Sequence, residues 1–137
     1  MKILFICKHN RFRSVVGEVI FNALNKNPNI IAESAGPSAS TCRQFINPEV
    51  IQVMRDKGYF IDATRKPRQV TSELVKDYDL VVIVADDVDP KFFSDYSGKI
   101  ILWKISDVTE ANEEQITDRV NKIEKRVRAL VKKMEKE

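Results

Sequence analysis

The chain has 137 residues, 43% hydrophobic and 31% charged, a balance typical of a protein that folds around one apolar core. No apolar run approaches the roughly 20 residues that a membrane-spanning helix needs, so no membrane partner is expected. The formal net charge of +3 is too small to indicate a nucleic-acid partner. We predict a single domain over residues 1–137 and, with two cysteines and no export signal, a cytoplasmic location.

The first predicted elements flank a short polar loop. A strand is predicted over residues 2–7, where the residues are mostly apolar and either β-branched or aromatic. A helix is predicted over residues 13–26, because apolar residues recur there at helical spacing. The loop between them therefore ends at a helix N-terminus, where unpaired backbone N–H groups and the helix dipole attract an anion such as phosphate.

The residue types in this loop indicate chemistry rather than structure alone. The loop reads Cys7-Lys8-His9-Asn10-Arg11-Phe12-Arg13-Ser14. The positive field favours the nucleophilic thiolate at Cys7, and the guanidinium of Arg13 can bind two oxyanion oxygens side by side. The hydroxyl of Ser14 is placed to donate a hydrogen bond to the thiolate. The loop therefore predicts phosphoryl transfer through a cysteine.

Other loop residues are assigned to phosphate binding with simpler roles. Asn10 tolerates a left-handed backbone, so it can let the loop curl without glycine. Lys8, His9 and Arg11 add positive charge, or face water as ordinary loop side chains. A small buried core residue is the alternative interpretation of Cys7, since a cysteine and an arginine at this spacing occur together by chance in many chains.

Strands and helices continue to alternate after the loop. This alternation predicts an α/β fold with an open parallel sheet and helices on both faces. Ligands bind such sheets outside the carboxyl ends of the strands, where the strand order reverses. In chain order, the pattern predicts a strand over residues 30–34, a helix from Asn47-Pro48 to about Gly58, a short helix over 71–77, strands over 80–84 and 99–103, and a helix over 113–136.

These motifs resemble the low-molecular-weight protein tyrosine phosphatases and the thioredoxin-coupled arsenate reductases that share their fold. Members place C-x-x-N-x-x-R-S after an apolar strand, and the matching residues here are Cys7, Asn10, Arg13 and Ser14. Later matches are Ser34-Ala35-Gly36, Asn47-Pro48 and the strand from Asp79 to Val84. The resemblance implies a four-stranded sheet in the order 2-1-3-4, a phosphate-binding loop after the first strand, and hydrolysis through a cysteinyl-phosphate without metal or cofactor.

Such a reaction needs a carboxylic acid that protonates the leaving oxygen and later activates water. The candidates follow the third and fourth strands and are Asp86, Asp87, Asp89 and Asp107. Family members carry the acid as Asp-Pro after the fourth strand, whereas the Asp-Pro of this chain, Asp89-Pro90, follows the third. We assign the acid to Asp107 from its place after the fourth strand, although Val108 follows it. A helix N-cap or turn residue is the alternative role.

Three departures from the family bear on substrate and activity. Phe12 replaces the second loop cysteine of many phosphatases, and His9 stands where glycine is common. The two further cysteines of arsenate reductases are missing after the third strand. Cys42 could replace them as a resolving thiol, or be an incidental loop cysteine.

No aromatic residue follows Asp107, unlike in tyrosine-phosphate members. An aromatic wall could instead come from residues that equally suit the core: Phe12, Phe45, Phe92, Phe93 and Tyr96.

The resemblance therefore implies a phosphatase acting on a phosphorylated protein or a small phosphomonoester. Arsenate reduction coupled to thioredoxin is the alternative, and a non-catalytic oxyanion-binding module is a third possibility.

Overall fold

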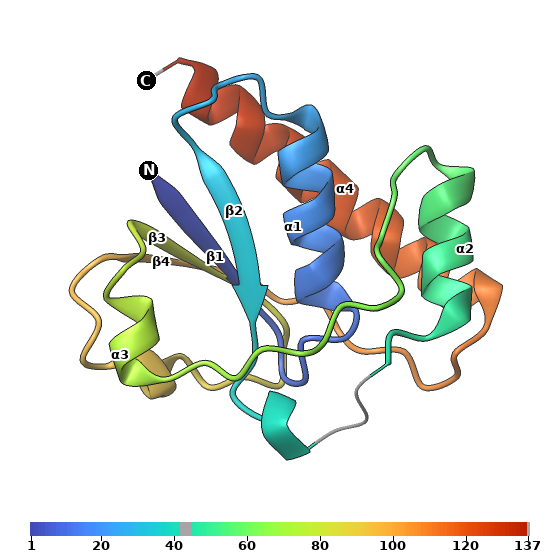
Figure 1. The fold of residues 1–137 in the computed structure, drawn as a ribbon, viewed down its shortest axis with the longest axis horizontal. Coiled ribbons are helices and arrows are strands. Elements are labelled where there is room, and N and C mark those ends of the chain that lie inside the picture. Colours follow the sequence, from blue (N-terminus) through green and yellow to red (C-terminus); the bar gives the residue numbers. More distant parts are fainter. Residues whose placement is uncertain (42–44, 137) are drawn as a thin grey trace.

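A computed structural model of the chain describes residues 1–41 and 45–136. The strands are β1 (Lys2–Ile6), β2 (Ile31–Ala35), β3 (Leu80–Val84) and β4 (Lys99–Trp103). The helices are α1 (Arg13–Leu24), α2 (Pro48–Asp56), α3 (Ser72–Val75) and α4 (Glu113–Glu135). The strands form one parallel sheet in the order β2-β1-β3-β4 (Figure 1), which confirms the predicted fold class and strand order.

The sheet brings the ends of β1, β2 and β3 together at one edge. Ile6, the last residue of β1, pairs with Ala35 of β2 on one side and with Ile83 of β3 on the other. β1 therefore ends between β2 and β3, where the strand order reverses. Cys7 follows directly and is buried. It therefore lies at the position where ligands bind in open parallel sheets.

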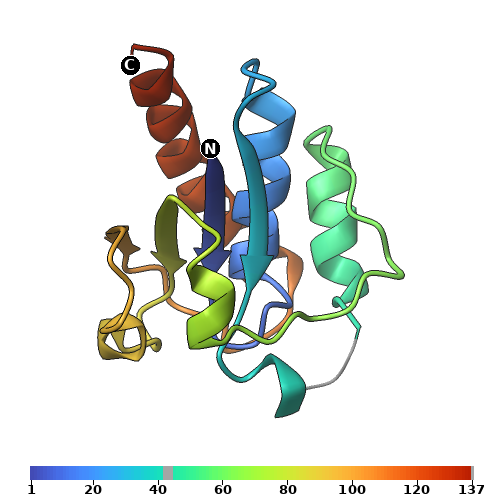
Figure 2. The same cartoon turned by 60° about the vertical axis from the view of Figure 1, so that its left-hand side comes forward.

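Helices cover the two faces of the sheet unequally. Figure 1 and Figure 2 show α1, α2 and α4 on one face and α3 on the other. The larger core lies under the first three helices, where the ring of Phe5 packs against Phe21 and Trp103 with centroid distances of 6.1 and 5.9 Å. The last helix buries an apolar stripe in this core, formed by Ile116, Val120, Ile123, Val127 and Leu130.

Element boundaries differ from the predictions where local polar contacts intervene. The first helix ends at Leu24 rather than residue 26, because Asn25 is extended and its side chain donates to the carbonyls of Asn27 and Ile30. The second helix begins as predicted, with Asn47 as its N-cap accepting from the Glu49 N–H. Gly58, with φ of 93°, follows its end.

The segment between α2 and α3 runs beside the carboxyl end of β2 (Figure 2). It has no helix or regular strand, yet it is anchored there through Gly36, whose N–H donates to Arg68 and whose carbonyl accepts from Val70. In the described part of the chain, no helix is both long and apolar enough to cross a membrane.

Candidate active site

The loop after β1 holds a buried thiol next to a hydroxyl. The Sγ of Cys7 lies 3.0 Å from the Oγ of Ser14, and both side chains are buried. Asn10 has φ of 55°, so the predicted left-handed residue of the loop is confirmed. Its side chain points into the protein and forms hydrogen bonds that hold the loop in shape.

The hydrogen bonds around Asn10 decide which atom donates to the thiol. Its Oδ1 accepts from the Arg68 backbone N–H at 2.9 Å, which fixes the orientation of the amide. Its Nδ2 then donates to Ser14 Oγ at 2.8 Å and to Ser34 Oγ at 2.9 Å. Because Ser14 Oγ already accepts this bond, its own O–H is free to donate to Cys7. A thiolate at Cys7 is stabilised by such a donor.

The same network continues from Ser34 towards the surface. Ser34 Oγ donates to Glu18 at 2.6 Å, and Glu18 in turn accepts two N–H groups of Arg65 at 2.9 and 3.1 Å. Sequence analysis missed Glu18 and Arg65. The available signal was weak: a lone carboxylate one helical turn after Ser14, on a helix whose buried residues are mainly apolar.

Gly36 allows β2 to pass unusually close to the loop. A Cβ atom at this position would lie 2.5 Å from the carbonyl oxygen of Cys7 and 2.7 Å from that of Lys8. These neighbours are backbone atoms, so they cannot turn away as a side chain would. The Ser-Ala-Gly motif therefore supplies one hydroxyl to the network and one residue without a side chain where the backbones cross.

Arg13 connects the loop to the next two strand ends. It is only 2% exposed, and its Nη1 donates to the carbonyl of Ile105 at 2.9 Å. Its Nη2 lies 3.0 and 3.2 Å from the two carboxylate oxygens of Asp87. Asp86 and Asp107 approach the guanidinium at 3.8 and 3.9 Å. Three carboxylates therefore surround one buried cation.

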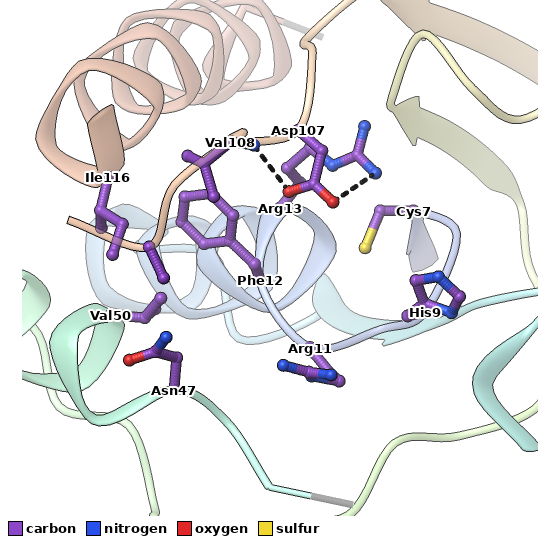
Figure 3. A pocket seen from close by; sticks show the side chains of 11 residues that line it. Cys7, His9, Arg11, Phe12, Arg13, Asn47, Val50, Asp107, Val108 and Ile116 are labelled. Carbon is purple, nitrogen blue, oxygen red and sulfur yellow. Dashed lines mark hydrogen bonds and ion pairs between the residues drawn. The ribbon is translucent and has the colours of Figure 1, made fainter. Parts of the chain in front are cut away.

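Two of the candidate acids, Asp89 and Asp107, lie in different places. Asp107 lines the same pocket as Cys7 and Arg13 (Figure 3). Its Oδ1 accepts from the N–H of Val108, and the N-cap of α4 is Asn112 rather than Asp107. Asp89 instead caps the short 3-10 helix over residues 90–93 and does not line the pocket. Of the two carboxylates, Asp107 is therefore the one beside the thiol.

The pocket at Cys7 has a volume of about 160 Å³. Arg13, Asp107 and His9 form polar parts of its wall, and Figure 3 shows the sulfur of Cys7 turned towards the open space. Its apolar wall consists of Phe12, Val50, Val108, Ala111 and Ile116. Lys8 is exposed outside the pocket, while Asn10 and Ser14 lie buried in the network beneath the loop.

Only one of the five aromatic candidates lines this pocket. Phe12 does so, whereas Phe93 is buried in the smaller core on the α3 face and Tyr96 packs against that core. Phe45 and Phe92 are exposed and are not part of the pocket wall. The replacement aromatic wall is therefore absent from the described part of the pocket, which is bounded mainly by aliphatic side chains.

The start of α1 offers uncommitted hydrogen-bond donors. Its N-cap is Phe12, which has no side-chain acceptor, and its first turn contains no acidic residue. The first N–H groups of a helix need an external partner when no side chain caps them, and the dipole favours a negative one. An oxyanion in the pocket can fill that role. Cys42, the candidate resolving thiol, lies outside the described residues.

Comparisons with known proteins agree with this geometry. A family model described as low molecular weight phosphotyrosine protein phosphatase matches residues 2–137. No curated protein matches.

The chain is also similar to several solved structures. Wzb of Vibrio vulnificus, in complex with benzylphosphonate, is 25% identical with a TM-score of 0.83, covering 96% of this chain and 97% of that one. Arsenate reductase from Archaeoglobus fulgidus is 30% identical with a TM-score of 0.73, covering 94% and 98%. A low molecular weight protein tyrosine phosphatase from T. tengcongensis is 23% identical with a TM-score of 0.82, covering 97% and 99%, and supports the fold alone.

Proposed function

The chain belongs to the low molecular weight phosphotyrosine protein phosphatase family and is a cysteine-dependent phosphatase of that family, and from this premise we propose that it hydrolyses phosphomonoesters through a cysteinyl-phosphate at Cys7. One observation carries the proposal. The Sγ of Cys7 lies 3.0 Å from a hydroxyl that is oriented to donate to it, in a pocket that also contains Asp107.

The substrate phosphate binds at the start of α1. Its oxygens accept the uncapped backbone N–H groups that follow Phe12, where the helix dipole adds to the attraction. Arg13 contributes the fixed positive charge. Its two Nη atoms are held by Ile105 and Asp87, so the guanidinium keeps its orientation before substrate arrives. Donors fixed in advance stabilise the charge of the transferring phosphoryl group without reorganising.

In the first step, the thiolate of Cys7 attacks phosphorus and the ester oxygen leaves. Asp107, in its protonated form, gives its proton to that oxygen, so that the product is a neutral alcohol or phenol. The new bond is sulfur to phosphorus and the broken bond is phosphorus to oxygen. Asp107 is ionised at the end of this step and stands 3.9 Å from Arg13.

In the second step, water hydrolyses the cysteinyl-phosphate. Asp107 removes a proton from the water, whose oxygen bonds to phosphorus as the sulfur leaves with the electron pair. The O–H of Ser14 donates a hydrogen bond to the departing thiolate, which makes sulfur a better leaving group. Inorganic phosphate is released, and Asp107 is protonated again for the next cycle.

The substrate is a phosphorylated protein or a small phosphomonoester. The related Wzb structure contains benzylphosphonate, which supports an aryl leaving group for the substrate of this chain. The wall of the pocket at Cys7 is nevertheless mainly aliphatic. We assign no metal or cofactor to the reaction. A reduced nucleophilic thiol suits a reducing compartment, so we place the enzyme in the cytoplasm.

Arsenate reduction is the second candidate, favoured by the 30% identity with the arsenate reductase from Archaeoglobus fulgidus. Arsenate has the shape and charge of phosphate and suits the same loop. Turnover requires a second thiol that attacks the sulfur of the Cys7–arsenate adduct, so that arsenite leaves with two electrons and the two thiols are oxidised to a disulfide. The loop after β3 contains no cysteine. Cys42 is then the internal candidate, with thioredoxin as the reductant.

A paired assay on one protein preparation tests the proposal. We expect hydrolysis of para-nitrophenyl phosphate that persists in EDTA and is abolished in Cys7→Ser. Activity in that variant would contradict the mechanism. Arsenate-dependent consumption of reduced thioredoxin that is lost in Cys42→Ala would support the reductase instead. Phosphate binding without any covalent intermediate would indicate a non-catalytic module.

A further inference from the structure

A second arginine, Arg11, lines the pocket. Arg11 comes from the loop between β1 and α1, and Figure 3 shows its guanidinium at the wall opposite Asp107. The Nε of Arg11 is buried, yet it has no hydrogen-bond partner among the described residues. A buried donor without a partner is unfavourable unless a ligand or an ordered water accepts its hydrogen bond. Arg13, in contrast, is held by Ile105 and Asp87.

Asn47 adds a donor on the same side of the pocket. As the N-cap of α2, it uses Oδ1 to accept from the Glu49 N–H at 2.8 Å. That bond fixes the orientation of the amide, so the Nδ2 group is turned away from Glu49. Figure 3 places Asn47 with Arg11 at the side of the pocket away from Asp107. Asp107 is the one acidic residue of the described pocket wall, and it already contacts Arg13.

We propose that Arg11 and Asn47 bind a carboxylate on the leaving group of the substrate. The inference rests on the proposed phosphatase function and adds a substrate class to it: phosphomonoesters whose leaving group carries a carboxylate. The first anion of the substrate, its phosphate, lies over Cys7 at the start of α1. The second is bound by the guanidinium and amide on the α2 side.

Size and charge support a carboxylate rather than a second phosphate. The pocket volume of about 160 Å³ is close to that of an apolar cavity that holds one benzene ring. Phe12, Val50 and Ile116 contact the carbon part of such a ligand. One guanidinium balances the single negative charge of a carboxylate, whereas a second phosphate group would carry nearly two. A planar carboxylate also matches the fork of N–H groups on arginine.

Binding of substituted benzylphosphonates tests this site without requiring turnover. The probes are two benzylphosphonates that carry either a carboxylate or a carboxamide at the same meta or para position. Their affinities for the unmodified protein are measured by titration calorimetry. We expect the carboxylate to bind about tenfold more tightly, the effect of one hydrogen-bonded charge pair in a partly buried site.

Substitutions then assign the preference to residues. Arg11→Gln should reduce the ratio of the two affinities to about one, Arg11→Lys should retain part of it, and Asn47→Ala should reduce it about threefold. Arg55→Gln is the control, because it removes the same charge from an exposed arginine on α2 outside the pocket. A ratio that stays near tenfold in Arg11→Gln, or falls equally in Arg55→Gln, would overturn the proposal.

The outcome is separable from that of the phosphatase assay. An Arg11-dependent preference in a protein that hydrolyses no aryl phosphate would support the anion site and contradict the proposed reaction. Hydrolysis with equal binding of the two phosphonates would support the reaction and overturn the anion site.

Discussion

The guanidinium of Arg13 meets the carboxylate of Asp87 through a single nitrogen, with Nη2 lying 3.0 and 3.2 Å from its two oxygens. The two residues are 74 positions apart in the chain and belong to loops that follow different strands. Asp87 thus holds the proposed phosphate clamp in place, but its negative charge also opposes the binding of an anion. The same contact therefore fixes the orientation of Arg13 and weakens anion binding beside it.

Substitution of Asp87 should separate these two effects. In Asp87→Asn the side chain keeps its shape and loses its charge, so inorganic phosphate should inhibit several-fold more tightly while kcat falls, because Arg13 is held less firmly. Steady-state kinetics with phosphate as inhibitor provide the measurement. Asp95→Asn is the control, because Asp95 is exposed and lies outside the pocket. Weaker phosphate inhibition in Asp87→Asn would contradict this account.

Arg13→Lys should lower kcat/KM by about 100-fold or more, since a point charge cannot replace the planar fork of the guanidinium. The same steady-state kinetics measure this loss.

Asp107→Asn should lower kcat by about 100-fold or more, because an amide neither donates the required proton nor accepts one from water. Vanadate and phosphate should still bind, since the loop and Arg13 are unchanged. Asp89→Asn is the matched control, as Asp89 lies outside the pocket and caps a short helix. If the Asp89 variant were the inactive one, the assignment of the acid would be wrong.

Ser14→Ala should slow the second chemical step more than the first. The hydroxyl donates to the sulfur that leaves when water attacks, and a hydrogen bond to a charged group contributes enough to change a rate about tenfold. Rapid-quench kinetics should therefore show a larger burst of product and a lower steady-state rate. Ser34→Ala, two hydrogen bonds further from Cys7 than Ser14, should have a smaller effect. A burst that disappears in Ser14→Ala would contradict the assigned role.

Two buried tyrosines predict a loss of stability at alkaline pH. Burial and a hydrogen bond to Glu124 raise the pKa of Tyr59 to about 12, and burial and a hydrogen bond to Glu33 do the same for Tyr78. Because each pKa is higher in the folded state than the usual value near 10, their stabilisation is complete below pH 10 and is lost as the pH rises towards 12.

At pH 11 the expected loss is roughly 1 kcal/mol for each of these tyrosines. Urea denaturation at pH 8 and pH 11 measures the free energy of unfolding. The decrease between the two pH values should be smaller in Tyr59→Phe, because phenylalanine does not titrate. An equal decrease in the variant and the unmodified protein would show that Tyr59 does not carry this linkage.

Local sequence patterns predict the fold well where a short apolar run decides the structure. β3 and β4 begin and end at the predicted residues, since each is a short, largely apolar run. The stripe of α4 follows from helical spacing. The first strand is one residue shorter than predicted, and the second is shifted to Ile31–Ala35, because pairing between neighbours fixes these ends.

The site was predictable only in part. Cys7, Arg13 and Asp107 line one pocket, as their positions after the first and fourth strands suggested. The pairing of Arg13 with Asp87 and of Arg65 with Glu18 could not be inferred, because contacts between distant side chains depend on how the loops fold. Which aromatic side chains reach the pocket could not be inferred for the same reason.

The hydrogen bond from the Arg68 backbone N–H to the Asn10 side chain also bears on the order in which the site forms during folding. It joins residues 58 positions apart, so a nascent chain can contain the nucleophile long before the loop around it is closed. We expect the amides of the loop and of the segment around Arg68 to gain protection together in pulse-labelled hydrogen exchange during refolding, and earlier protection of the loop would contradict this. We therefore expect the hydroxyl of Ser14 to be held beside Cys7 only after the ribosome has synthesised the chain beyond Arg68.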